Sequence, residues 1–153
     1  MRRRIFTLLA ALAILVFAGG TVAAGNNGDT RSLTVVERAL TDTTIDLGAT
    51  GDSLGDQLAF GNPIYDKANT TKIGRDEGTC FRTNPGLAWE CTWTTIVPHG
   101  SLTVQGPFYD NLRDSKLAIT GGTGTYRNAR GQMTLHARNA AGSEFDFIFV
   151  IQD

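Results

Sequence analysis

The chain has 153 residues, and its 14 lysines and arginines nearly balance its 15 aspartates and glutamates, for a formal net charge of −1. Without a long basic tract, it has no electrostatic footprint for nucleic acid or an anionic membrane, and we expect neither as a partner. The length fits one domain that can bury a hydrophobic core.

The N-terminus has the pattern of a secretory signal peptide. Arg2, Arg3 and Arg4 precede an apolar run from Ile5 to Phe17, and small residues end in Val22-Ala23-Ala24. A membrane anchor is the alternative, but this run is shorter than the ~20 residues that a transmembrane helix needs. We therefore expect cleavage after Ala24, which makes residues 1–24 the signal peptide, and a secreted mature protein outside the membrane.

Residues 25–31 are polar and rich in glycine and asparagine, so we expect a disordered leader. From residue 32 to residue 153, short β-rich runs alternate with turn residues and show no helical period. This pattern predicts an all-β domain, an eight-stranded antiparallel β-barrel that leaves no strand edge unpaired. A β-sandwich would show the same periodicity. The expected strands are Ser32–Leu40, Asp56–Tyr65, Thr71–Thr83, Ala88–Val97, Ser101–Phe108, Lys116–Thr120, Gly131–Arg138 and Glu144–Ile151.

A hairpin is expected around the turn Asn84-Pro85-Gly86. Its register places Cys80 opposite Cys91, Gly78 opposite Trp93 and Arg82 opposite Trp89. In an oxidising compartment, cysteines that face each other across two strands pair, so we expect a Cys80–Cys91 disulfide. Alternation then places Trp89, Trp93 and both cysteines inside, with Asp76 on the same side nearer the rim.

The last expected strand alternates Phe145, Phe147 and Phe149 with residues of the other face. The phenylalanines are expected to line the interior. Ile148 and Val150 would then lie outside, where they favour a subunit contact; scattered surface aliphatics are the alternative.

Glu37 alternates with Leu33 and Val35 on a face that should be interior, and Asn62 shares parity with Leu58 and Phe60. A buried acid needs a hydrogen bond or a raised pKa, a combination common at functional sites. Two alternatives stay open. Glu37 could face outward, and Asn62 could be a turn residue before Pro63.

The segment from Gly100 to Gly131 combines VQGP and LAITGG with GTGTYRNARG. Gly121, Gly122 and Gly124 fall where side chains would obstruct positive φ or a close backbone approach. The first two motifs resemble those of the allene oxide cyclases, and the third resembles a motif of their barrel-fold relatives, the dirigent proteins. The stretch DSLGDQLAFGNPIY from Asp52 to Tyr65 also matches the cyclase pattern SLGDxxxFxNxxY, and Asn62 precedes Cys80 by the cyclase spacing of 18 positions.

The resemblance implies a barrel that holds one hydrophobic small molecule in an aromatic-lined cavity, in proteins that are typically homotrimers. Glu37 matches the cyclase first-strand glutamate, and Asn62 matches the asparagine that holds the epoxide oxygen through a water. Cys80 matches the cavity cysteine, although a disulfide would remove its thiol. Arg130 resembles the cavity-mouth arginine of dirigent proteins.

The chain departs from both patterns at several positions. Ala39 stands where the cyclases have an asparagine, and the segment 41–47 lacks their Ser-Pro pair. The aspartates of the dirigent second strand align with Gly61 and Asn62. Arg130 could therefore instead be a surface arginine that braces the glycine-rich loop.

No metal-ligand spacing, Ser-His-Asp grouping or phosphate-binding loop occurs near His99 or His136, and we expect no cofactor and no metal. The first functional hypothesis is an isomerase or cyclase. The second is a non-catalytic dirigent-type binder, and a filled barrel without a cavity is a third possibility. Under the first hypothesis, Glu37 and Asn62 are catalytic, and the substrate contacts Phe60, Asp76, Trp89, Trp93, Arg130 and Phe147.

Overall fold

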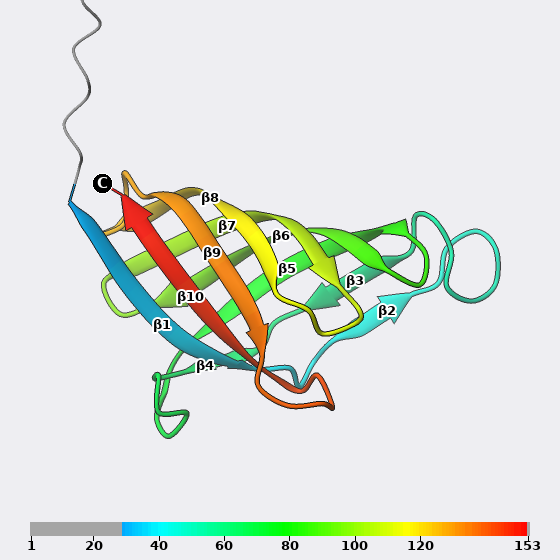
Figure 1. The fold of residues 1–153 in the computed structure, drawn as a ribbon, viewed down its shortest axis with the longest axis horizontal. Coiled ribbons are helices and arrows are strands. Elements are labelled where there is room, and N and C mark those ends of the chain that lie inside the picture. The colour runs from blue at the N-terminus through cyan, green and yellow to red at the C-terminus, as the bar shows by residue number, and fades with distance from the viewer. Residues whose placement is uncertain (1–28, 153) are drawn as a thin grey trace, which may run out of the picture.

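Antiparallel pairing closes the sheet into a barrel in the computed structural model, which describes residues 29–152 (Figure 1). The expected signal peptide and residues 25–28 of the expected leader lie outside the described residues. Within residues 29–152, no helix is long and apolar enough to cross a membrane. The strands are β1 (Thr30–Arg38), β2 (Thr43–Ile45), β3 (Gln57–Phe60), β4 (Pro63–Tyr65), β5 (Lys72–Asn84), β6 (Ala88–Val97), β7 (Gly100–Tyr109), β8 (Ser115–Gly124), β9 (Arg130–Ala137) and β10 (Glu144–Gln152).

These strands occupy eight positions around the barrel. β3 and β4 both pair with β5, along the same edge, and act as two parts of one barrel strand. On their other side, β4 pairs with β1, and β3 pairs with the short β2. The remaining order is β1-β10-β9-β8-β7-β6, and the pairing of β6 with β5 completes the ring. The eight-stranded barrel is therefore confirmed, and the sandwich alternative is excluded.

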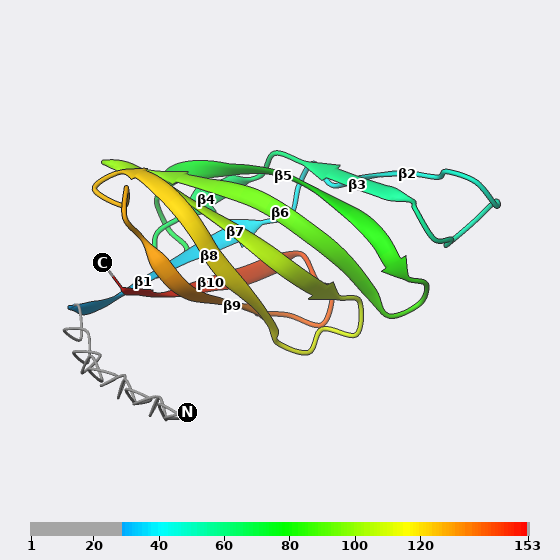
Figure 2. The ribbon, with the colours of Figure 1, turned by 90° about the horizontal axis from the view of Figure 1, so that it is seen from above.

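The expected strand from Asp56 to Tyr65 is not continuous. It breaks between β3 and β4 at residues 61 and 62, and the strand beside it breaks between β1 and β2 at residues 39–42. β2 itself was not expected, and β1 begins at Thr30, within the expected leader. The paired breaks lie at the end of the barrel from which β2 and β3 project, opposite the C-terminus (Figures 1 and 2).

The hairpin of β5 and β6 has the predicted register, with Cys80 opposite Cys91, Gly78 opposite Trp93 and Arg82 opposite Trp89. The two cysteines form the predicted disulfide. Both lie in the interior, as do Trp89 and Trp93. The hairpin thus fixes one wall of the barrel covalently.

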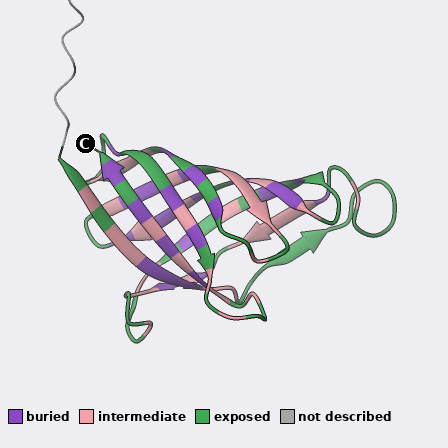
Figure 3. Cartoon of the chain, in the orientation of Figure 1, coloured by how far each residue is buried: buried purple, intermediate pink, exposed green. Residues whose placement is uncertain are grey.

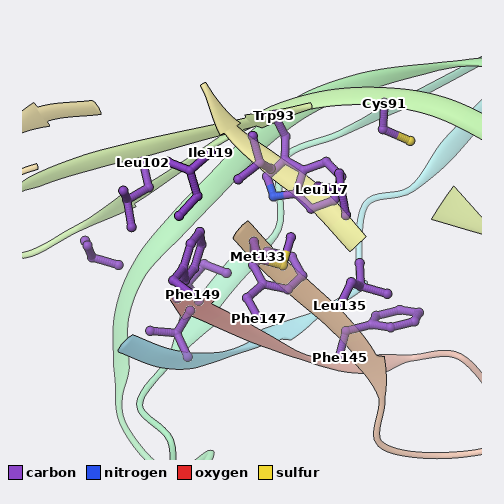
Figure 4. Packing of buried hydrophobic residues seen from close by; sticks show 14 of the residues in the cluster. Cys91, Trp93, Leu102, Leu117, Ile119, Met133, Leu135, Phe145, Phe147 and Phe149 are labelled. Atoms are coloured by element: carbon purple, nitrogen blue, oxygen red, sulfur yellow. The ribbon is translucent and has the colours of Figure 1, made fainter. Parts of the chain in front are cut away.

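Buried and exposed residues alternate along the strands, as the banding in Figure 3 shows. The expected interior phenylalanines of β10 are buried, whereas Val150 on the outer face is 40% exposed. Between the walls, fully buried side chains fill the half of the barrel away from β2 and β3; Leu102, Met133 and Phe149 are examples (Figure 4). The trimer inferred from Ile148 and Val150 stays a prediction.

The glycine-rich stretch in β8 meets the expectation at Gly124. Its φ is +58°, and a Cβ placed there would lie 2.1 Å from the carbonyl oxygen of His99. Only glycine avoids both the strained dihedral and the clash. This position closes the turn between β6 and β7 against the end of β8.

The disulfide closes a short loop, because its cysteines have a sequence separation of 11. Loss of that constraint should lower the free energy of unfolding by about 3 kcal/mol in the chain-entropy model. Urea unfolding of the oxidised protein and of a Cys80→Ser/Cys91→Ser variant would measure the difference. Thiol titration of the denatured, unreduced protein should find no free thiol, and finding two would contradict the pairing.

Candidate functional site

The side chain of Asn62 joins the two strand breaks. Asn62 is 0% exposed, and its Oδ1 accepts hydrogen bonds from the backbone N–H groups of Leu40 and Thr41, each at 2.9 Å. The Thr41 hydroxyl also donates to this Oδ1 at 3.1 Å. Across the same gap, the Gly61 N–H donates to Thr41 Oγ1 at 2.9 Å. Side-chain bonds therefore replace the backbone ladder where β1 ends and β3 gives way to β4.

The amide nitrogen of Asn62 positions two carboxyl groups. Nδ2 donates to Glu37 Oε1 at 2.8 Å and to Asp42 Oδ1 at 2.7 Å. An amide has two N–H groups, so both are engaged. Asn62 therefore acts on the site through the carboxyl groups that it holds, and a substrate oxygen would have to displace one of them to reach the amide.

Glu37 points inward, as one of the two sequence interpretations predicted, and is only 6% exposed. Burial raises the pKa of its carboxyl well above the usual range, and the charge of the neighbouring Asp76 raises this pKa further. Burial also raises the pKa of Asp76, to about 6. Two neighbouring carboxyl groups that are both buried cannot both ionise readily, so Glu37 and Asp76 do not titrate independently.

Asp76 lies deeper than the sequence suggested. It was expected near the rim, but it is 0% exposed. Its Oδ1 accepts the backbone N–H of Asn62 at 2.9 Å, whereas Oδ2 accepts no N–H or hydroxyl donor from residues 29–152. A hydrogen bond between the Glu37 and Asp76 side chains contributes to the raised pKa of Glu37.

A small pocket lies beside Glu37, with a volume of ≈ 30 Å³, room for a water molecule or two. Glu37 and the exposed Asp42 are its acidic members, and the Cys80–Cys91 disulfide forms part of its wall. The rest of the lining is apolar: Leu58, Phe60, Trp93, Phe108, Leu135, Phe145 and Phe147. The barrel is therefore largely filled, but not completely, and the pocket combines aromatic walls with carboxyl groups.

Trp93 is the centre of the aromatic wall. Its ring lies 6.0 Å from that of Phe60 in an edge-on arrangement. The ring of Phe147 lies 5.5 Å from that of Trp93 (Figure 4). Gly78 permits the first contact, since a Cβ there would lie 2.3 Å from the Trp93 Cβ and 2.8 Å from Phe60 Cζ. Phe60, Trp93 and Phe147 thus meet at the pocket, as expected.

Trp89 does not line this pocket. It is buried at the rim, where its Nε1 donates to Asp110 Oδ1 at 2.9 Å and the Arg82 guanidinium lies 3.8 Å above its ring. Arg82 also forms ion pairs with Asp52 and Asp110. Trp89 therefore belongs to a cluster that fastens the loop before β3 to the hairpin of β5 and β6.

Arg130 is not brought to the pocket either. It is exposed at the start of β9, where it pairs with Gln152 near the C-terminus. Leu135, near the other end of β9, is the residue of this strand that reaches the pocket. Any role for Arg130 therefore lies at the opposite end of the barrel from Glu37.

Sequence reasoning missed Asp42, Phe108 and Leu135 as lining residues, whereas it had placed Phe145 in the interior. The alternation in β7 and β9 places Phe108 and Leu135 inside, and this signal could have found them. Asp42 lies in the break between β1 and β2, where no periodicity applies. Within residues 29–152, no three His, Cys, Asp or Glu side chains are grouped so that they could hold a metal ion.

Comparison with known proteins gives one family match and several matches of fold. The family model described as allene oxide cyclase matches residues 22–140. A solved structure of a pyocyanin demethylase superposes with a TM-score of 0.66 at 23% identity, covering 78% of this chain and 100% of the other.

Two further structures have the same fold. A pterocarpan synthase dirigent protein gives a TM-score of 0.67 at 14% identity, covering 84% of this chain and 98% of its own. A Diels–Alderase from Streptomyces koyangensis gives a TM-score of 0.60 at 14% identity, covering 86% and 72%. At such identities the likeness shows the barrel fold alone.

The first prediction from this geometry concerns Asn62. Asn62→Ala removes five side-chain hydrogen bonds and leaves buried partners unpaired, so it should lower the free energy of unfolding by about 3 kcal/mol or more. Denaturant unfolding would measure this loss. Asn128→Ala, at an exposed position, is the control and should change stability by less than about 0.5 kcal/mol. Equal effects would show that the amide does not join the strands.

The second prediction concerns pH. Because the pKa of Asp76 rises on folding from 3.8 to about 6, the folded state binds more protons than the unfolded state in that range. The contribution of Asp76 to the free energy of unfolding is complete below pH 3.8, its pKa in the unfolded chain. It is lost as pH rises toward and through about 6, the pKa in the folded protein, by up to about 1.4 kcal/mol per pH unit.

Asp76→Asn should therefore flatten the decline in stability between pH 4 and pH 7, relative to the unchanged protein. Urea unfolding at several pH values measures the difference between the two proteins, in which titrating groups away from the site cancel. Glu37 does not cancel, but its effect has the same sign, because loss of the Asp76 charge lowers the raised pKa of Glu37. Glu77→Gln, on the exposed face of the same strand, should leave the decline unchanged. A decline that is identical in all three proteins would contradict a raised pKa at Asp76.

Proposed function

Because the chain belongs to the allene oxide cyclase family, we propose that its barrel binds one hydrophobic small molecule and guides the cyclisation or isomerisation of that molecule. The observation that carries the proposal is the buried pair of Glu37 and Asp76 beside an aromatic pocket. Burying two carboxyl groups costs stability. Such a pair is therefore better explained by chemistry than by folding.

The pair can act in two ways on a substrate in the pocket. A carboxyl group whose pKa is raised toward neutrality can donate a proton to a substrate oxygen and take it back later. The negative charge that the pair shares can also stabilise positive charge that develops on the substrate, and this effect is strong where water is excluded. Both actions use Glu37, because it lines the pocket, whereas Asp76 lies behind it.

The aromatic walls supply the conformational control. Phe60, Trp93 and Phe147 meet at fixed angles around the pocket and favour a folded conformation of an apolar chain or ring. Because the pocket volume is only ≈ 30 Å³, a substrate requires side chains to move. Leu58, Phe60 and Phe108 are the apolar lining residues that are only partly buried, so they are best placed to do so.

A non-catalytic dirigent-type binder is the second candidate. Its support is the amide of Asn62, whose two N–H groups are both engaged by carboxyl groups and not free for a substrate oxygen. Ala39, in place of the cyclase asparagine, removes another polar group. Such a protein would use the same aromatic pocket to hold a reactive intermediate without a proton-transfer step of its own.

We further propose that the mature protein works outside the cytoplasm, after cleavage following Ala24. The Cys80–Cys91 disulfide supports this proposal, because such bonds persist mainly in oxidising compartments. The exposed Val150 on the outer face of β10 supports a homotrimer as the assembly.

The test begins with the ligand that copurifies with the protein, identified by mass spectrometry. Glu37→Gln keeps the shape and most of the hydrogen bonding but removes the proton-donating group. We expect ligand affinity to change little and turnover to fall about a hundredfold or more. Trp93→Ala should instead weaken binding, because it removes a large apolar wall.

Glu77→Gln is the matched control, since it makes the same chemical change on the outer face of β5. It should alter neither quantity. If Glu37→Gln leaves rate and product stereochemistry unchanged while Trp93→Ala abolishes binding, the passive binder is the correct function.

A further inference from the structure

Four buried polar atoms of β5 and β6 lack a hydrogen-bond partner among residues 29–152. Arg82 Nε is one of them, but it forms an ion pair with Asp52. The other three are Asp76 Oδ2, Trp93 Nε1 and Thr95 Oγ1. Asp76 and Thr95 are 0% exposed, and Trp93 is 3% exposed. Buried polar atoms almost always have partners, because an unpaired one costs the full penalty of its desolvation. Asp76 has the Glu37 carboxyl group beside it as a hydrogen-bond partner. Trp93 Nε1 and Thr95 Oγ1 have none among residues 29–152, and two such atoms on one strand call for a shared explanation.

The register brings these side chains together. Asp76 lies directly opposite Thr95 in the ladder of β5 and β6, and both point into the barrel. Trp93 precedes Thr95 by two positions, so the two share the interior face of β6. In Figure 4, the indole nitrogen of Trp93 lies on the side of the ring away from Cys91.

The three atoms have complementary hydrogen-bonding capacities. The indole N–H can only donate, a carboxylate oxygen can only accept, and a hydroxyl can do either. Asp76 Oδ2 has two lone pairs, so it can accept a second bond in addition to a proton from Glu37. One oxygen that accepts from Trp93 and donates to Asp76 would satisfy the set. A hydroxyl oxygen does both, whereas a carbonyl oxygen cannot donate.

We propose that Asp76, Trp93 and Thr95 form a subsite that binds one hydroxyl oxygen, supplied by a water molecule or by a hydroxyl-bearing substrate. The subsite lies behind the pocket, since Asp76 and Thr95 do not line it, while Trp93 borders both. This inference rests on the proposed function only in naming a substrate hydroxyl. A bound oxygen here would fix the Trp93 ring and the carboxyl group that shares a proton with Glu37.

Thr95→Val tests the subsite by the sign of its effect, because valine has nearly the same shape as threonine but no hydroxyl. If Thr95 Oγ1 binds an oxygen, Thr95→Val leaves that oxygen and its partners short of a bond, and Tm should fall. If Thr95 Oγ1 binds nothing, the change removes an unpaired polar group, and Tm should rise. Thr92→Val on the exposed face of β6 is the control for the effect of valine in this strand.

A fall in Tm could also come from a direct bond between Thr95 and Asp76, so a second measurement is needed. In NMR spectra, the Trp93 indole N–H should show a cross-relaxation signal to a long-lived water, and Thr95→Val should abolish it. The Trp89 indole N–H, which is bonded to Asp110, is the internal reference. A rise in the Tm of Thr95→Val would overturn the proposal. So would a fall in its Tm if neither the water signal nor the phenol titration detects an oxygen bound at the Trp93 N–H.

Titration with phenol and toluene separates the two sources of the hydroxyl. Phenol should shift the Trp93 N–H resonance at concentrations at least tenfold lower than toluene does, and Thr95→Val should remove this preference. A water signal that phenol does not displace identifies the oxygen as water alone. None of these measurements uses turnover, so the subsite and the proposed function can fail separately.

Discussion

The amide of Asn62 takes the place of the backbone hydrogen bonds that the barrel loses where two of its strands break. Without the breaks, β1 would continue into β2 and β3 into β4, and the wall would be a regular ladder at this point. With them, one side chain must satisfy the backbone of Leu40 and Thr41. The same amide then orients Glu37 and Asp42. The side chain of Asn62 therefore both closes the barrel at the strand breaks and positions the carboxyl groups of the acidic site.

The buried carboxyl groups of the site lower the stability of the fold, and the rest of the barrel offsets this loss. Glu37 and Asp76 are buried together without a cationic partner in the ion pairs of residues 29–152, and the pKa of each is raised mainly by burial. The filled half of the barrel, the disulfide and the cluster around Arg82 offset this cost. The pocket lies at one end of the barrel because side chains fill the interior of the other half.

Close packing of the hairpin determines what the pocket presents. Gly78 lets Phe60 approach Trp93, and the disulfide above it keeps β5 and β6 in register. Trp93 lines the pocket, and its buried Nε1 has no hydrogen-bond partner among residues 29–152. A side chain at position 78 would clash with the Trp93 Cβ and with Phe60 Cζ and would disturb the contact between the two rings, although Gly78 itself carries no functional group.

Much of this was predictable from the sequence, because alternation along a strand is local. Parity alone placed Trp93, Phe147 and both cysteines inside, and the turn at Asn84-Pro85-Gly86 set the register that pairs Cys80 with Cys91. The sequence motifs in residues 52–65 and 100–131, which resemble those of the allene oxide cyclases and the dirigent proteins, indicated the barrel. Parity also placed Glu37 inside, but it left the outward orientation open. What only the tertiary structure decided is which interior residues meet. Asp42 joins Glu37 because two strands break side by side. Arg130 lies far from both because it is the first residue of β9, which begins at the other end of the barrel. Contacts of this kind depend on long-range strand pairing, for which a period of two residues carries no information.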